Sequence, residues 1–522
     1  MILGQTSPQQ MATAGSAGRA TLDDMFRRAV ARHPDTLALV DPPDRAAAIG
    51  GAPRRFTFAE ADRMVSVIAG RLRRMGLQTD QVVAFQTGNT VEGVLTLLGI
   101  LRAGLIAAPL PLLWRKADAV AALSQVGARA LIVCGRVGDV DLSEHAMHVA
   151  AEVFPIRYVC AFGSKAPDGV VPFDELFETD KPDPVHAIER AVNPAAHVAV
   201  ITWDVGPDGL IPVARTHFEF LAASLGVVLE SRIEQGAKIL SSLAQSSFAG
   251  LAVTVVPWLL VGGMLSLHQA FDAATFAAQC DGGQHSHVIV PGPLATRLAE
   301  AGILTKRNGV KAVIAAWRAP ERLPAAPLWR EPAVGLADVQ VFGEAGLVVA
   351  RRGSNGKPAP IAFGSVTAPR GAPGAVLVAD LSRTDSGTVA IRGPMVPRFP
   401  YPPGAERGDA PFFEVKDDGF VDTGFPCRVD LDTRAMVVTG PPPGIVSVGG
   451  YRFALRDLQD LTGHIEPEST LAALPDTLTG HRLAGGAGNR DGMQEALLSR
   501  GLNPLIVDAF RDRRPLEQST AA

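Results

Sequence analysis

Cysteine is the residue type in this chain with the widest chemistry, because a thiolate can ligate a metal or form a disulfide. The chain has four: Cys134, Cys160, Cys280 and Cys427. They stand far apart, without a Cys-x-x-Cys pair and without a histidine at the spacing of a zinc site. This pattern is typical of free thiols in a reducing compartment, so we expect a cytoplasmic protein without disulfides or structural zinc.

The composition indicates a globular protein with a large apolar core. Of 522 residues, 47% are hydrophobic and 20% are charged, and this length predicts two or more packed units. The formal net charge of −4 offers no basic face for phosphates, so nucleic acid is not an expected partner. Residues 1–19 are rich in Gly, Ser, Ala and Gln, which predicts a flexible tail, and they lack the pattern of a secretory signal.

One uncharged segment, residues 239–271, has the composition of a membrane span. Pro257 and the pair Gly262 and Gly263 divide it into pieces too short to cross a bilayer. We therefore expect a buried helix followed by a buried strand and no transmembrane segment, with a membrane helix as the alternative.

The elements that must position any site alternate between helix and strand. Thr57 and Glu60 form a capping box that starts a helix, and Gly76 supplies the left-handed residue that ends it. The alternation that follows predicts a parallel sheet covered by helices. Its segments are strands 81–85, 106–109 and 130–134, helices 91–103 and 119–126, and the later runs 197–202, 218–228, 249–260 and 287–290.

The character of the sequence changes after residue 375. Short strand-like runs at 376–378, 388–391 and 435–438 alternate with turns rich in Gly and Pro, which predicts a small β-rich subdomain. Residues 441–444, Pro-Pro-Pro-Gly, are the clearest linker signal in the chain. We therefore place domain boundaries at 20–440 and 441–522.

An ordered set of short motifs resembles the adenylate-forming superfamily, which includes acyl-CoA synthetases and peptide-synthetase adenylation domains. The resemblance extends from about residue 20 to 460. It implies an α/β fold: a large N-terminal domain of sandwiched α/β sheets with a small β-rich subdomain, then a small, shortened C-terminal α+β domain. The motifs are FTFAE (56–60) with RLRRMG (71–76), TGNT (87–90), LGILRAGLIAAP (98–109), TH (216–217), TGFPCRVD (423–430) and GGYR (449–452).

The resemblance also implies a two-stage reaction. A carboxylate attacks the α-phosphate of ATP to give acyl-AMP, and a thiol such as coenzyme A then displaces AMP. The first stage brings two anions together, so it requires backbone amides, a cation and usually Mg²⁺ aimed at the developing charge. An active member would therefore use ATP, AMP, Mg²⁺ and coenzyme A.

The segment at the position of the family's phosphate loop, residues 202–212, has changed its chemistry. Only Thr202, Gly206 and Gly209 keep the family's character, in which small residues let backbone amides close on phosphate oxygens. Two aspartates add negative charge, and two prolines remove amide donors. The family lysine is absent, and Arg215 is a partial substitute. A structural turn is the alternative interpretation.

The other nucleotide motifs are altered as well. Glu344 offers a carboxylate for Mg²⁺ only if the family's metal ligand is shifted by two positions. Phe425 replaces the family's carboxylate that grips both ribose hydroxyls, a bidentate role that an apolar ring cannot fill. The nucleotide-binding candidates implied by the resemblance are Thr202, Gly206, Gly209, Arg215, Phe342, Gly343, Glu344, Asp422 and Arg428, with Glu344 as the metal candidate and a surface ion pair as the alternative for Arg428.

The family's catalytic lysine in the small domain has no counterpart, because Lys416 is the last lysine of the chain. Arg511, Arg513 or Arg514 could supply charge there, but a guanidinium differs from an ammonium in width and hydration. The catalytic residues are therefore unknown.

An acyl pocket is implied beside the uncharged segment, and its composition suggests an apolar acid. Ordinary core packing is the alternative for each candidate. The substrate-binding candidates are Ser246, Ser247, Phe248, Gly250 and Trp258.

Four functions remain open. We favour a divergent acyl-CoA synthetase homologue that handles an apolar carboxylate or its acyl thioester, with adenylation weak or lost. The alternatives are a fully active acyl- or aryl-CoA ligase and a non-catalytic protein that binds a metabolite or a protein partner. A transferase that keeps only thioester chemistry is a further hypothesis, and the resemblance leaves a homodimer or a protein partner open.

Overall fold

The helices begin and end where their capping residues predict. At the start of α4 (Phe58–Arg74), the Thr57 hydroxyl accepts a hydrogen bond from the Glu60 amide, and the Glu60 carboxylate accepts one from the Thr57 amide. Gly76 follows with a φ of 83°, a conformation that favours glycine. The predicted alternation between residues 58 and 134 is confirmed, with boundaries shifted by up to three residues. The computed structural model describes residues 1–3, 16–163, 166–178, 188–190, 192–269 and 271–511.

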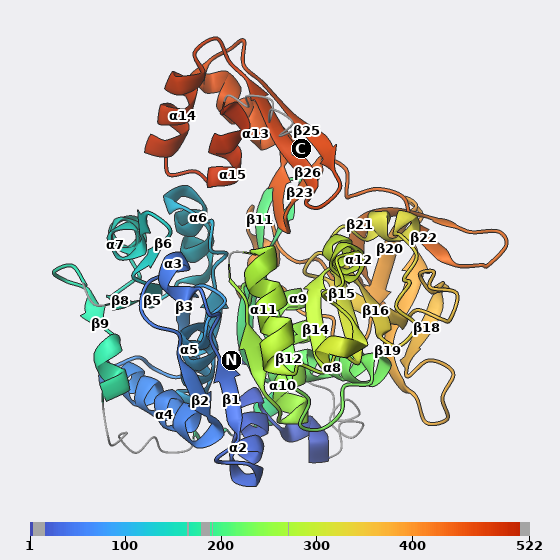
Figure 1. Cartoon of the computed structure of the whole chain (residues 1–522). Helices are drawn as coiled ribbons and strands as arrows, with labels where there is room; N and C mark the ends of the chain where they lie inside the picture. The colour runs from blue at the N-terminus through green and yellow to red at the C-terminus, as the bar shows by residue number, and fades with distance from the viewer. Residues whose placement is uncertain (4–15, 164–165, 179–187, 191, 270, 512–522) are drawn as a thin grey trace, which may run out of the picture.

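Two large sheets form the main body (Figure 1). The seven-stranded sheet is parallel apart from its edge strand β11, which pairs antiparallel with β10. Its strands, in spatial order, are β11 (Gly209–Thr216), β10 (Val198–Gly206), β4 (Ile106–Pro109), β3 (Val82–Gln86), β5 (Ala130–Cys134), β8 (Tyr158–Phe162) and β9 (Val171–Pro172).

The second sheet has eight strands and is parallel except at its two edges. In spatial order it contains β17 (Gly346–Arg351), β16 (Gly335–Phe342), β15 (Ala312–Trp317), β14 (His287–Pro291), β12 (Ile239–Ser241), β13 (Leu265–Leu267), β1 (Leu37–Val40) and β2 (Arg55–Thr57).

Helices fill the space between the sheets and cover their outer faces. Ile132 of β5 and Ile289 of β14 belong to one apolar cluster, together with the helices that separate the two sheets. Two further clusters bury the outer faces. The inner helices are α2 (Leu22–Arg32), α4, α5 (Val91–Arg102), α8 (His217–Ser231) and α10 (Val256–Val261); the outer ones are α6 (Lys116–Val126), α7 (Leu142–Glu152), α11 (Ala273–Gly283) and α12 (Gly292–Glu300).

The uncharged segment 239–271 lies in this buried layer. After β12 it forms α9 (Phe248–Gly250), the π-helical turn η4 (Leu251–Val255) and α10, and then the buried strand β13. The prediction of a buried helix followed by a buried strand is confirmed. Within the described ranges, no helix combines the length and apolarity needed to cross a membrane.

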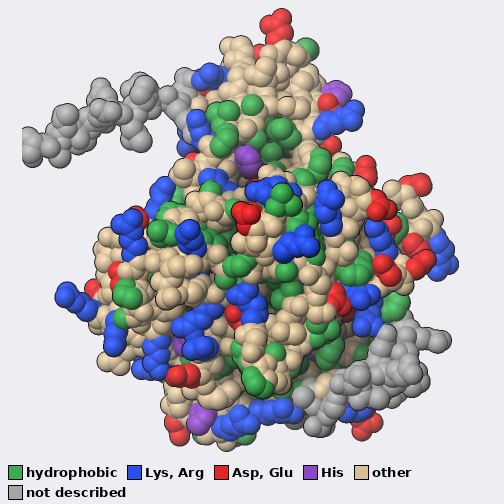
Figure 2. Space-filling view, turned by 90° about the vertical axis from the view of Figure 1, so that its right-hand side faces the viewer, with side chains coloured by type: hydrophobic (Ala, Val, Ile, Leu, Met, Phe, Trp, Pro, Cys, Tyr) green, Lys and Arg blue, Asp and Glu red, His purple; other side chains and the backbone are tan. Residues whose placement is uncertain are grey.

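A β-rich subdomain and a C-terminal α+β unit complete the chain, and the predicted fold class is confirmed (Figure 1). In the space-filling view the C-terminal unit stands above the main body, and basic and acidic side chains are both scattered over this face (Figure 2). The subdomain contains β18 (Gly364–Ala368), β19 (Val376–Arg383), β20 (Thr388–Arg392), β21 (Val421–Val429) and β22 (Met436–Val438); the C-terminal unit contains β23 (Ile445–Val448), β24 (Tyr451–Ala454), α13 (Leu455–Ile465), β25 (Thr470–Asp476), β26 (Gly480–Gly486), α14 (Arg490–Ser499) and α15 (Pro504–Val507).

The predicted tail falls largely on residues 4–15, which lie outside the described residues. Ser16–Arg19 form a short 3₁₀ helix, and the Met1 ammonium forms an ion pair with Asp80. The four cysteines are free and buried, as predicted.

Candidate functional site

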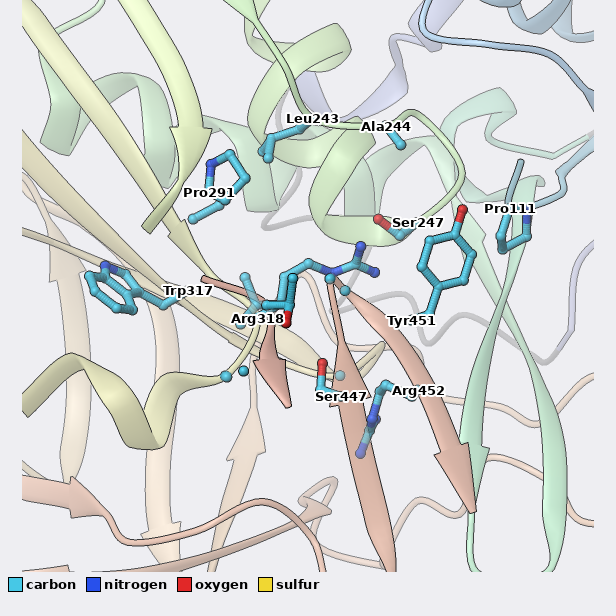
Figure 3. Close-up of a pocket in the computed structure, with 18 of the residues that line it drawn as sticks. Pro111, Leu243, Ala244, Ser247, Pro291, Trp317, Arg318, Ser447, Tyr451 and Arg452 are labelled. Atoms are coloured by element: carbon cyan, nitrogen blue, oxygen red, sulfur yellow. The ribbon is translucent and has the colours of Figure 1, made fainter. Parts of the chain in front are cut away.

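A cavity of about 380 Å³ lies where the main body meets the C-terminal unit, and we refer to it as the interdomain cavity (Figure 3). Three parallel strands end at its wall: β12 just before Ser242, β14 at Pro291 and β15 just before Arg318. The carboxyl ends of parallel strands meet at one edge of a sheet, where α/β proteins commonly bind ligands. The opposite wall comes from the C-terminal unit, at the turn between β23 and β24.

Apolar side chains form much of the cavity wall. Trp114 and Trp203 meet there in an edge-to-face arrangement, with ring centroids 5.7 Å apart. Leu243, Pro291 and Leu294 extend the apolar surface from the ends of β12 and β14. The volume lies near the lower end of the roughly 300–1,000 Å³ typical of small-molecule pockets.

Glu344 is the buried acid of the site. One of its carboxylate oxygens accepts hydrogen bonds from the Thr202 hydroxyl at 2.6 Å and from the Phe248 amide at 2.9 Å. Burial raises the pKa of Glu344 above its ordinary value, since the charged form is poorly solvated. Thr202 and Phe248 therefore hold the Glu344 carboxylate in place without lining the cavity themselves. Glu344 is part of the cavity lining.

Arg215 is fully buried beneath this acid. Its guanidinium lies 3.7 Å from the centre of the Phe248 ring and donates hydrogen bonds to the carbonyl oxygens of Glu344 and Ala345. Burial lowers the pKa of Arg215 to about 10. It therefore holds the turn that carries Glu344 and does not reach the cavity wall.

The segment predicted to bind phosphate is a β-hairpin. Strands β10 and β11 pair from Val200 opposite Arg215 to Gly206 opposite Gly209, with a two-residue turn between them. Gly209 has a φ of 119° and lies at that turn, outside the cavity lining. A paired strand leaves fewer amides to converge on one anion than an open loop does.

Asp204, in the middle of this hairpin, forms an ion pair with Arg452 of the C-terminal unit. Its other carboxylate oxygen accepts a hydrogen bond of 2.8 Å from the Glu344 amide. A Cβ on Gly343 would lie 2.3 Å from that oxygen, so only glycine fits beside the pair. The Arg452 guanidinium also lies 5.7 Å from the centre of the Phe425 ring.

Phe425 thus has a packing role at the position where the resemblance implies a ribose-binding carboxylate. Its ring meets Phe342 edge to face at 5.8 Å, and both rings are buried. Phe342 packs against Phe425, and Phe425 in turn lies beside the Arg452 guanidinium.

Arg318 directly follows β15 and projects into the interdomain cavity, where Figure 3 shows its guanidinium extended into the space between Ser247, Tyr451 and Ser447. It makes no hydrogen bond or ion pair with any described residue, and burial lowers its pKa. A Cβ on Gly450 would lie 2.6 Å from its Nη1, so glycine leaves room for this side chain. Sequence reasoning missed Arg318; an arginine directly after the apolar strand 312–317 was the available signal.

Of the remaining nucleotide candidates, the structure places two on the exposed surface. Asp422 accepts a hydrogen bond from the Thr388 hydroxyl at 2.7 Å, and Arg428 lies 3.9 Å from Asp430. Neither reaches the cavity lining.

The substrate candidates are divided between the cavity and the core. Ser246 and Ser247 line the cavity. Trp258 is buried in the core, where its indole N–H donates to the Gly263 carbonyl at 2.6 Å. Gly250 packs against the backbone, since a Cβ there would lie 1.8 Å from the Ala244 carbonyl oxygen.

The residues present do not fit a Mg²⁺ site. Asp204 is engaged by Arg452, and Glu344 is buried and already accepts two hydrogen bonds. In the part of the chain that is described, no three His, Cys, Asp or Glu side chains are grouped to hold a metal ion. Arg511 is exposed and pairs with Asp508 at 3.2 Å, whereas Arg513 and Arg514 lie outside the described residues.

Comparison with known sequences identifies relatives over part of the chain. The long-chain fatty acid transport protein 1 of Bos taurus is 30% identical over 160 residues, which cover 31% of this chain and 23% of that protein. The beauvericin nonribosomal cyclodepsipeptide synthetase BEA1 of Gibberella fujikuroi is 30% identical over 125 residues, which cover 24% of this chain and 4% of the synthetase. The chain thus spans less than a quarter of either relative.

Solved structures share the fold over nearly the whole chain. The amide bond synthetase McbA of Marinactinospora thermotolerans superposes with a TM-score of 0.72 at 16% identity, covering 93% of this chain and 94% of McbA. ATP-bound MatB of Rhodopseudomonas palustris has a TM-score of 0.59 at 18% identity, covering 92% of each chain. The family model described as AMP-binding enzyme matches residues 26–370. This chain therefore belongs to the AMP-binding enzyme family.

Proposed function

We propose that this chain is a divergent member that binds an apolar carboxylate or its acyl thioester in the interdomain cavity, with ATP-dependent adenylation weak or lost. The ion pair between Asp204 and Arg452 carries this proposal. The pair places the Asp204 carboxylate on the segment that corresponds to the family's phosphate loop. It also engages the guanidinium of Arg452, which is the cation that faces this segment. A nucleotide phosphate approaching this segment would find no free cation on it, because Asp204 already neutralises the charge of Arg452.

The size of these effects supports weak adenylation. Removal of a single donor that stabilises a developing oxyanion costs about 3–4 kcal/mol in the transition state. The phosphate loop, metal ligand, ribose carboxylate and C-terminal lysine are four such losses, against roughly 8–23 kcal/mol that enzymes supply in total. Such losses do not add simply, but even two of them would slow the reaction by several orders of magnitude.

A fully active acyl- or aryl-CoA ligase is the second candidate, and family membership favours it. Exchange of labelled pyrophosphate into ATP separates the two, since it detects adenylation whatever the final acceptor. We expect no exchange above the enzyme-free rate across short, medium and aromatic acids. We also expect calorimetry to give a dissociation constant weaker than about 1 mM for Mg²⁺·ATP, which corresponds to a binding free energy weaker than about −4.1 kcal/mol. Rapid carboxylate-dependent exchange with any of these acids would contradict weak or lost adenylation.

A further inference from the structure

The charges that line the interdomain cavity leave one net positive charge. Three arginines and two acids line it, and no described lysine or histidine does. Arg452 pairs with Asp204, and Arg322 donates to the carbonyl oxygens of Asp476 and Gly480. With both acids ionised, one further negative charge would neutralise the lining of the cavity. This charge balance favours a monoanionic ligand over a triphosphate.

Arg318 is the lining cation without a partner in the described chain. A guanidinium presents its N–H donors in a planar fork that matches the two oxygens of a carboxylate. A cation left partly out of water without such a partner is unfavourable, so a bound anion would stabilise it. Arg318 lies between the end of β15 and the C-terminal unit, so the anion would bind between the two walls of the cavity (Figure 3).

The rest of the wall, including Leu243 and Leu294, offers apolar surface for the remainder of that ligand.

We propose that Arg318 binds the carboxylate of a free apolar monocarboxylic acid, whose body lies against the tryptophan and leucine side chains of the cavity. This inference rests on the proposed function and narrows its substrate to the free acid. An acyl thioester carries no charge at the acyl carbon, so it would leave Arg318 unpaired. Arg318 is thus a binding residue for the acid's charge, a role that the sequence motifs of the family do not assign to it.

Isothermal titration calorimetry tests this with octanoate and 4-butylbenzoate, each compared with its primary amide, and with the uncharged thioester S-octanoyl-N-acetylcysteamine. The variants are Arg318→Met and Arg318→Lys, with Arg330→Met as the control because Arg330 is exposed and remote from the cavity lining. We expect the wild type to prefer each acid over its amide. Arg318→Met should weaken acid binding by about 10-fold to 100-fold, the range for a charge-assisted hydrogen bond, and leave amide binding unchanged.

Arg318→Lys should give an intermediate loss, because lysine keeps the charge but not the fork, and it carries the test if Arg318→Met does not fold. Unchanged acid affinity in the Arg318 variants would overturn the role of Arg318 and leave the proposed function standing. If the wild type binds the thioester but not the acid, the role of Arg318 is likewise overturned and the proposed function still stands. Binding of neither ligand by the wild type would contradict the proposed function itself.

Discussion

Individual buried groups define the site. Glu344 and Arg215 lie in one buried network, yet Glu344 bonds through its side chain to Thr202 and Phe248, whereas Arg215 bonds to backbone carbonyls. Glu344 is satisfied by its own neighbours, and Arg215 does not reach the cavity lining, where one of its terminal nitrogens could otherwise have met a ligand. The residue that is left for a ligand is Arg318.

Glu219 offers a test of electrostatics at the residue scale. It closes the capping box of α8 with Thr216, and burial raises its pKa from an ordinary 4.5 to about 7. Between these pH values the folded state keeps a proton that the unfolded state has released, so the contribution of Glu219 to stability falls as pH rises. Glu219→Gln keeps the cap and should raise the free energy of unfolding at pH 8 by roughly 1–3 kcal/mol.

The matched control is Glu60→Gln, which alters the same capping position in the exposed start of α4. Urea denaturation at pH 4 and pH 8 measures both variants. The increase in the free energy of unfolding that Glu219→Gln gives at pH 8 should be absent at pH 4. A gain of equal size at both pH values, or an equal gain in Glu60→Gln, would contradict the burial of a titrating carboxyl group.

Two elements, the β10–β11 hairpin and strand β24, form the seam between the main body and the C-terminal unit. The Tyr451 hydroxyl of β24 accepts a hydrogen bond of 3.1 Å from the Leu113 amide, next to the pair of Asp204 and Arg452. These bonds attach β24 to the main body at two adjacent points. They make β24 a fixed wall of the interdomain cavity in this structure.

Removal of Arg452 should loosen that seam. Arg452→Met leaves Asp204, whose side chain is 16% exposed, without its cation, which we expect to cost about 1–3 kcal/mol. Hydrogen–deuterium exchange in residues 445–454 should then accelerate by about 10-fold to 100-fold. Arg456→Met is the control, because the Arg456 side chain is 89% exposed on α13. Equal exchange in both variants would show that the ion pair does not hold the seam.

At the scale of the whole molecule, the cysteines report on global unfolding. Burial raises the pKa of Cys134, Cys160 and Cys280 to about 12, and it raises that of Cys427 as well. Since the thiolate is the reactive form, labelling of the native protein by Ellman's reagent at pH 8 should be on the order of 1000-fold slower than in 6 M guanidinium. All four thiols should react after unfolding. A thiol that reacts rapidly in the native protein would contradict its burial.

Much of the fold could be predicted from the sequence, and the site only in part. Thr57 with Glu60 and the apolar spacing after them predicted α4 because a cap and a helical period are local properties. The family resemblance implied a pocket beside the uncharged segment, and Ser246 and Ser247 of that segment do line the interdomain cavity. Trp258 was predicted there too, but one residue's direction in a buried helix depends on what packs around it.

The sequence by itself determined the order of helices and strands, the buried uncharged segment, the free thiols and membership of an adenylate-forming fold. Only the tertiary structure decided that Arg452 meets Asp204 across 248 residues of chain, and that Arg318 meets no partner in the described chain. Capping and helical periodicity depend on a few neighbouring residues, so they can be predicted from the sequence alone. The pairing of charges across a domain seam depends on how whole sheets pack, and no local pattern records it.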